Sequence, residues 1–115
     1  MLEENDCVDY ICMGEGEDCL VELARALRDS VDVSGIPNLG WRDDDGTPIY
    51  NPLRPLEQHP DRWPFPDRAV YDHYPFVRKR RTVSVMSARG CPYKCTFCFN
   101  VTMQEMYRGK GKYVR

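Results

Sequence analysis

The sequence predicts an α/β fold in which one strand and one helix lead into a hairpin, a proline-rich linker and a cysteine-rich loop. Three observations carry this prediction. A short apolar run rich in β-favouring residues occupies positions 7–13. A glycine turn and an amphipathic helical pattern follow at positions 14–30. Residues 81–88 are β-branched and alternating, which predicts a second strand just before the cysteines.

The first strand and helix form a β–α step. Residues 7–13, CVDYICM, are predicted to be a buried strand, and Gly14–Asp18 supply a glycine turn with acidic residues at the start of the helix. Such a step is typical of the end of an open α/β sheet. The helical apolar stripe consists of Leu20, Val21, Leu23, Ala24 and Leu27.

A hairpin is predicted next, with LGWR and PIY as its strands and DDDG as its turn, where Gly46 is free to take a left-handed conformation. Residues 52–76 contain six prolines, which disfavour helix interiors and central strands. We therefore expect an extended surface linker anchored by Trp63 and Phe65. Residues 101–115 predict a short helix followed by a loop rich in glycine and lysine.

The charge is divided unevenly along the chain. Residues 1–75 hold 6 Lys/Arg and 17 Asp/Glu, a net charge of −11, whereas residues 76–115 hold 10 Lys/Arg and 1 Glu, a net charge of +9. The basic run at 78–81 fits a solvated segment, a contact with an acidic neighbour, or an anionic partner such as nucleic acid. Positive surroundings also favour thiolates at the nearby cysteines.

Composition places the chain among soluble proteins. No apolar run approaches the ~18 residues of a membrane helix, and the N-terminus has no apolar stretch of the signal-peptide type. We therefore expect a cytoplasmic protein without a transmembrane segment. In that compartment the six cysteines are expected to be metal ligands or free thiols rather than a disulfide framework.

Three cysteines, Cys91, Cys95 and Cys98, are concentrated in one loop that Gly90 and Pro92 allow to turn tightly. A structural zinc site needs four ligands, usually two close pairs. Here a fourth ligand would have to come from a distant residue. A disulfide would leave one cysteine unpaired, and three unrelated buried cysteines would need no ligand. The distant candidates for zinc are His59, His73, Cys7, Cys12 and Cys19.

An iron–sulfur cluster fits the triplet better. A cubane cluster that only carries electrons usually has four cysteine ligands. Three ligands leave one iron open to a substrate or cofactor, which is the general arrangement of catalytic metal sites. The triplet therefore suggests chemistry at the cluster.

The spacing Cys91-x3-Cys95-x2-Cys98 after a strand, with Phe97 before the last cysteine, resembles the signature of the radical S-adenosylmethionine enzymes. The resemblance implies that these cysteines hold a [4Fe-4S] cluster whose open iron binds S-adenosylmethionine. Reductive cleavage would give a 5′-deoxyadenosyl radical that abstracts hydrogen from a small-molecule substrate. Phe97 would pack beside the adenine. Arg89 and Gly90 match the common RGCP lead-in and are expected to shape the loop. No catalytic residue beyond the cofactor-binding residues is assigned.

The upstream segments VDYICMGEGED, SGIPNLGWRDDDG and PFPDR resemble the subgroup whose radical domain follows a cobalamin-binding domain. This implies three parts. Residues 1–34 would end a flavodoxin-like cobalamin-type domain, residues 35–80 would be a hairpin and linker, and residues 81–115 would begin a partial (β/α)6 TIM-like barrel. Cobalamin would then be a further cofactor, and methyl transfer or oxidative cyclisation the reaction. The Asp-x-His-x-x-Gly motif of the cobalamin axial ligand is not present, and the residues around His73 do not fit it.

The resemblance also implies that the chain is truncated at both ends and needs the remainder of its own chain for full activity. A reducing electron donor of the flavodoxin or ferredoxin type is expected. Two alternatives remain at this point. One is a zinc-binding module that contacts nucleic acid through its basic half, although nucleic acid is not the expected partner. The other is a radical enzyme similar to those that thiolate transfer RNA, which share the cysteine spacing.

Overall fold

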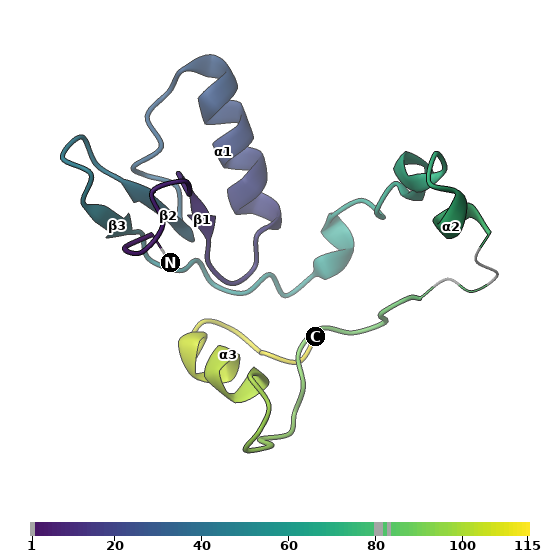
Figure 1. The fold of residues 1–115 in the computed structure, drawn as a ribbon. Helices are drawn as coiled ribbons and strands as arrows, with labels where there is room; N and C mark the ends of the chain where they lie inside the picture. Colours follow the sequence, from purple (N-terminus) through teal and green to yellow (C-terminus); the bar gives the residue numbers. More distant parts are fainter. Residues whose placement is uncertain (1, 80–81, 83) are drawn as a thin grey trace.

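The computed structural model describes residues 2–79, 82 and 84–115. Figure 1 shows an N-terminal unit of sheet and helix (residues 2–51), a linker that leads away from it (52–79), and a C-terminal segment (84–115) that lies near it again. The radius of gyration is 17.1 Å, whereas a compact domain of this length has roughly 13 Å. The chain is therefore open in shape, and its packed part is the N-terminal unit.

Within the described residues the sheet has three antiparallel strands in the order β1 (Ile11–Cys12), β2 (Leu39–Arg42) and β3 (Pro48–Tyr50). Strands β2 and β3 form the predicted hairpin, with Trp41 opposite Ile49. Gly46 has a φ of 79°, which confirms its left-handed conformation. The turn is closed by the Asp43 carboxylate, which accepts the backbone N–H of Thr47 at 2.8 Å.

The first strand is much shorter than predicted. Only Ile11–Cys12 pair with β2, and the run at 7–13 is partly exposed, so the prediction of a buried strand over this run was wrong. In the described part of the chain β1 is an edge strand, so it has a neighbouring strand on one side only. The flavodoxin-like description of this region stays a prediction, because an antiparallel sheet of three strands does not test it.

Helix α1 (Glu17–Asp29) forms where the sequence predicted it. Its buried residues are Cys19, Leu23 and Ala26, which pack with Ile36 and Leu39 in the core. These helical positions are spaced by three and four residues and so share one face. Of the predicted stripe only Leu23 is buried. The other four residues are exposed because the sheet covers one side of the helix only: Leu20, Val21, Ala24 and Leu27.

The linker is less extended than predicted. It contains 3₁₀ turns at Pro60–Arg62 and Arg68–Tyr71 and the single-turn helix α2 at Pro75–Arg78. Two of these begin at a proline, whose fixed φ suits the first helical position. Trp63 is an anchor, since its indole N–H donates to the Asp18 carboxylate at 3.2 Å. Phe65 is not an anchor, because it is 94% exposed.

The C-terminal segment confirms one prediction and leaves another open. Helix α3 (Asn100–Met106) is followed by a loop in which Gly109 and Gly111 have positive φ. A strand was predicted at 81–88, where Arg81 and Val83 lie outside the described residues. Residues 84–88 are exposed, and within the described residues they pair with no strand. The first strand of a barrel therefore stays a prediction.

Asn38 is the buried polar centre of the N-terminal unit. It is fully buried and has a φ of 67°, a conformation that asparagine tolerates better than most residues. Its side-chain amide donates to the carbonyls of Met13 (2.9 Å) and Glu15 (3.0 Å). Its side-chain oxygen accepts the N–H of Arg54 at 2.7 Å. One side chain thus joins the end of β1 to the start of the linker.

Replacing Asn38 by alanine is expected to lower the free energy of unfolding by about 2–4 kcal/mol, since buried backbone groups lose their partners. Urea denaturation followed by circular dichroism measures this. Asn38→Gly is the matched control, because glycine accepts the left-handed backbone without strain. If Asn38→Gly unfolds like the wild type, the side-chain hydrogen bonds do not stabilise the unit.

Candidate functional site

The three predicted cluster ligands lie on the loop that precedes α3. All are free thiols, with Cys95 exposed and Cys91 and Cys98 partly buried. Among the described residues no group of three or more Cys, His, Asp or Glu side chains is close enough to bind a metal, so the thiols do not converge. The same holds for His59, His73 and the upstream cysteines, the distant zinc candidates. Phe97 is 92% exposed.

The loop is held by α3, which begins two residues after its last cysteine. The Gln104 side-chain amide donates to the backbone carbonyls of Cys91 (2.7 Å) and Tyr93 (3.2 Å), and the N–H of Cys98 donates to the carbonyl of Cys95 at 3.0 Å. Gln104, in the second turn of α3, therefore fixes the first half of the loop. Sequence reasoning missed Gln104, because a single glutamine in a helix gives no signal of what it contacts.

Cys98 lies in surroundings that favour its thiolate. Hydrogen bonds from the backbone and then from the side chain of Asn100 lower its pKa. The side-chain amide lies 3.3 Å from the sulfur, and the Tyr113 hydroxyl donates to the amide oxygen at 2.9 Å, which orients the N–H groups toward the sulfur. Asn100 is a second residue that sequence reasoning missed.

The residues just before the cysteine loop (the lead-in, Arg89 and Gly90) are hydrogen-bonded to the C-terminal residue. Arg89 and Arg115 exchange two backbone hydrogen bonds, of 2.7 and 3.0 Å. Gly90 has a φ of 79°, and a Cβ there would overlap the backbone carbonyl of Tyr113. Glycine is thus required on two grounds, which agrees with the predicted role of Arg89 and Gly90 as residues that shape the loop.

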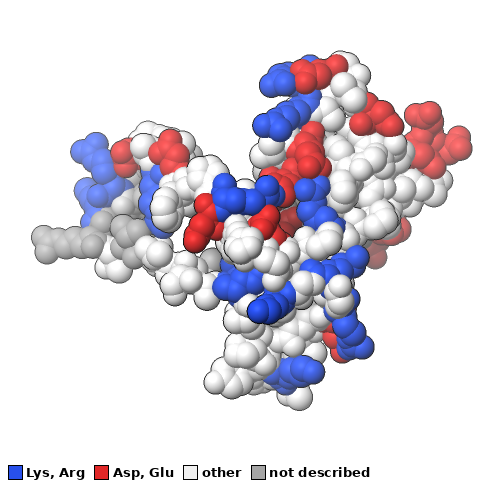
Figure 2. Space-filling model, turned by 180° about the vertical axis from the view of Figure 1, so that it is seen from behind, with Lys and Arg blue, Asp and Glu red and all other residues white. Residues whose placement is uncertain are grey.

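An acidic turn, Gly14–Asp18, follows β1, includes the first two residues of α1 and faces this lead-in. Glu17 pairs with Arg89 at 2.5 Å, and Glu15 pairs with both Arg89 (3.4 Å) and Arg115. Burial alone would raise the pKa of Glu17, but the hydrogen bond and charge of Arg89 outweigh it and lower the pKa. Figure 2 shows acidic and basic side chains intermingled in the middle of the face it presents.

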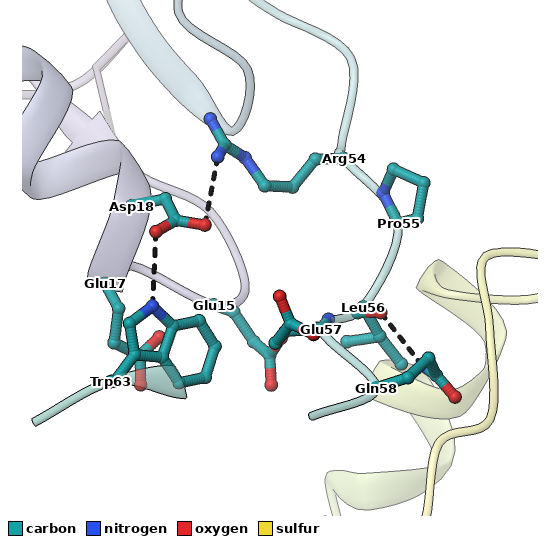
Figure 3. A pocket seen from close by; sticks show the side chains of 9 residues that line it. All are labelled: Glu15, Glu17, Asp18, Arg54, Pro55, Leu56, Glu57, Gln58 and Trp63. Atoms are coloured by element: carbon teal, nitrogen blue, oxygen red, sulfur yellow. Dashed lines mark hydrogen bonds and ion pairs between the residues drawn. The ribbon is translucent and has the colours of Figure 1, made fainter. Parts of the chain in front are cut away.

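Beside this turn lies a half-open cavity of about 310 Å³ (Figure 3). Asp18 is central to it and pairs with Arg54 (3.2 Å) and Arg62 and accepts from Trp63. The carboxylates around the cavity are therefore already neutralised by arginines, so we assign it no ligand. The lining residues are Glu15, Glu17, Asp18, Arg54, Pro55, Leu56, Glu57, Gln58 and Trp63.

Two upstream cysteines also meet at the acidic turn. The sulfur atoms of Cys12, on β1, and Cys19, on α1, are 3.0 Å apart. Burial, and then the hydrogen bond from Cys12, raises the pKa of Cys19 to about 12. Cys19 is thus a protonated core thiol at neutral pH and a poor metal ligand as it stands.

The chemistry of the donors, rather than their present geometry, fits an iron–sulfur cluster. Three free thiols lie within eight residues on one accessible loop, and one of them has a lowered pKa. Thiolates are the usual ligands of such clusters. The remaining requirement is that the loop closes so that the three sulfurs converge.

Comparison with known proteins finds relatives among enzymes. An uncharacterized methyltransferase of Pyrococcus horikoshii is 35% identical over 101 residues, which cover 84% of this chain and 21% of that protein. The anaerobic magnesium-protoporphyrin IX monomethyl ester cyclase of Rubrivivax gelatinosus is 28% identical over 94% of this chain and 20% of that enzyme. The cyclase of the same name from Synechocystis is 26% identical over 85% of this chain and 20% of its own length.

The chain spans about a fifth of the length of these curated relatives. The similarity to a methyltransferase and to cyclases supports descent from an enzyme family, and it supports the resemblance at the level of the superfamily. No family model matches the chain, and no solved structure matches it. In the described residues, no helix is both long and apolar enough to cross a membrane.

The thiols of Cys12 and Cys19 are expected to react very differently in the folded chain. Because only a thiolate is nucleophilic and the pKa of Cys19 is raised, iodoacetamide at pH 8 should label Cys12 and spare Cys19. Peptide mass mapping after a timed reaction measures both. Labelling in urea is the control, where both should react; equal labelling without urea would contradict the buried position of Cys19.

The lowered pKa of Cys98 should depend on the side chain of Asn100. In Asn100→Ala the remaining backbone hydrogen bond keeps part of the effect, so the pH at which Cys98 reaches half-maximal alkylation rate should move upward. A pH series with Cys91 and Cys95 changed to serine, read by peptide mass mapping, resolves this thiol from the three upstream cysteines. Asn51→Ala, an asparagine of the N-terminal unit bonded to the carbonyl of Ile36, is the control. An unchanged midpoint in Asn100→Ala would show that the amide does not act on the sulfur.

Proposed function

We propose that this chain is part of a radical S-adenosylmethionine enzyme and that Cys91, Cys95 and Cys98 hold its [4Fe-4S] cluster. The observation that carries the proposal is the single accessible loop with three free thiols, of which Cys98 is biased toward the thiolate. A chain whose matched relatives are named as a methyltransferase and cyclases fits this proposal.

The residues of this chain divide the work of binding as follows. Asn100 stabilises the Cys98 thiolate, and Gln104 binds the Cys91 carbonyl at the other end of the loop. Helix α3 therefore holds both ends of the segment that carries the three thiols. Phe97, exposed beside Cys98, is available to pack on the adenine of S-adenosylmethionine. When bound, the cluster supplies the electron that cleaves S-adenosylmethionine and yields the radical.

The finer proposals concern the reaction and its partners. The names of the relatives suggest methyl transfer or an oxidative ring closure under anaerobic conditions as the outcome on a small-molecule substrate. The order of the acidic turn, hairpin, linker and cysteine loop is the basis for proposing cobalamin as a second cofactor. We further propose a flavodoxin or ferredoxin as the electron donor. A cytoplasmic location accords with these partners, and the remainder of the enzyme would supply the other cofactor contacts.

Anaerobic reconstitution with iron and sulfide tests the proposal on this chain of 115 residues. The wild type should take up about four irons and absorb near 400 nm, as expected for a cubane cluster. A variant with Cys91, Cys95 and Cys98 changed to alanine should lose both signals. The control changes the exposed Cys7 and Cys12 instead, and should keep them.

The same samples distinguish the zinc alternative. One tightly bound zinc and no iron in the wild type would replace the enzyme proposal with a zinc-binding module. We expect no such binding, because a structural zinc site needs four ligands and the loop supplies three cysteines.

A further inference from the structure

The acidic turn Gly14–Asp18 contacts both flanks of the cysteine loop, a role that neither the sequence pattern nor the relatives' names assign to it. Upstream of the loop it holds Arg89, which precedes Cys91 by two residues. Downstream it holds Tyr107, which follows α3. These contacts join residues 74 and 92 positions apart. The turn is therefore the place where the N-terminal unit meets the C-terminal segment.

The downstream contact is made by a buried tyrosine side chain. Tyr107 is 2% exposed, and its hydroxyl accepts the N–H of Glu15 at 2.8 Å and lies 3.4 Å from the Asn38 amide. Gly14 has a φ of 72°, and a Cβ there would overlap the tyrosine hydroxyl. The glycine thus leaves the space that the tyrosine fills, so the turn and the end of α3 are complementary in shape.

The upstream contact combines charge, an aromatic ring and backbone. The Arg89 guanidinium pairs with Glu17 at 2.5 Å and lies 4.8 Å from the centre of the Trp63 ring. Its backbone pairs with Arg115, whose side chain is 4% exposed and whose guanidinium pairs with Glu15. Exposed ion pairs contribute little to stability. The Glu15 carboxylate, in contrast, is largely buried and is shared by Arg89 and Arg115, which restricts both arginines to one arrangement.

Fixing both flanks of a loop has a direct consequence for the groups inside it. The chain entropy that must be lost when three thiols converge is smaller if the ends of their loop are already held together. Between Arg89 and Tyr107, side-chain hydrogen bonds that hold the described residues of the loop come from Gln104 and Asn100, both of the same segment. The acidic turn therefore sets where the loop begins and ends while leaving its thiols free to close.

We propose that Glu15 and Glu17 are positioning residues for the cysteine loop, acting through Arg89, Arg115 and Tyr107 and not by touching the cofactor. The acidic turn would then make cluster binding by the C-terminal segment depend on the folded N-terminal unit. This inference rests on the function proposed above, because it assigns a role in presenting the cluster ligands.

The experiment compares Glu17→Arg, Arg89→Glu and the double exchange, which restores a pair of opposite charges in reversed order. Hydrogen exchange of the metal-free chain reports docking. The N–H groups of Arg89 and Arg115 should exchange about tenfold faster in each single variant and recover in the double exchange. After anaerobic reconstitution, iron content should fall in the single variants and recover with the same pattern.

Two further variants make the comparison specific. Asp29→Arg introduces the same charge change at the far end of α1, where Asp29 pairs with Arg28, and should leave docking and iron unchanged. Tyr107→Phe deletes one hydroxyl and should accelerate exchange at the Glu15 N–H and lower iron content. Loss of hydrogen-exchange protection throughout α1 would show that Glu17→Arg unfolds the N-terminal unit. In that case Tyr107→Phe decides whether docking of the C-terminal segment controls iron content.

The outcomes separate this inference from the proposed function. Loss of docking in the single variants with full iron content would overturn the positioning role alone. Unchanged exchange at Arg89 in Glu17→Arg would overturn it as well. A wild type that keeps Arg89 protected but takes up no iron would overturn the proposed function, and the positioning role with it. The charge-dependent loss and recovery of iron would establish both.

Discussion

The buried amide of Asn38 is the contact on which the arrangement of this chain depends. It closes the space between the end of β1, the acidic turn and the start of the linker with hydrogen bonds to three separate backbone segments. Its own backbone adds two more, to Met13 and Pro52. Because the carbonyls of Met13 and Glu15 are fixed by this amide, the turn presents its glycine and its carboxylates to the C-terminal segment. A side chain without both donor and acceptor could not satisfy these partners at once.

The division of charge along the chain has a structural counterpart. Acidic side chains of the N-terminal half, at the turn and the first part of α1, face arginines of the linker and of the C-terminal segment. The linker start lies against the same segment, since Leu56 and Lys110 bond through their backbones and Lys112 bonds to Gln58. Opposite charges in the two halves favour their association through Arg89 and Arg115, which pair with Glu15 and Glu17. The interpretations of the basic run at 78–81 stay predictions, because Arg80 and Arg81 lie outside the described residues.

Local features of the sequence were predictable, whereas long-range contacts were not. The hairpin followed from its turn chemistry, and α1 and α3 from helical patterns, because each depends on neighbours in sequence. The buried face of α1 was assigned incorrectly for Leu20 and Leu27, since the side that the sheet covers is decided by Ile36 and Leu39. Gln104, Asn100 and Tyr107 gave no signal, because their importance comes from partners met only in the fold. The cysteine loop was evident from spacing alone, but whether its sulfurs converge depends on a cofactor that spacing cannot place.

The contact of Tyr107 with the acidic turn also bears on the order in which the parts of the chain fold during synthesis. The strands, helix and turn of the N-terminal unit form from contacts within the first part of the chain, and they can be complete while the cysteine loop is still being made. The contacts between Glu15 and Tyr107 or Arg115 span 92 and 100 residues, so they form last and over the longest loop. The folded turn then acts as a template on which the nascent cysteine segment settles. Docking of the cysteine segment is in this way delayed until the surface that receives it exists.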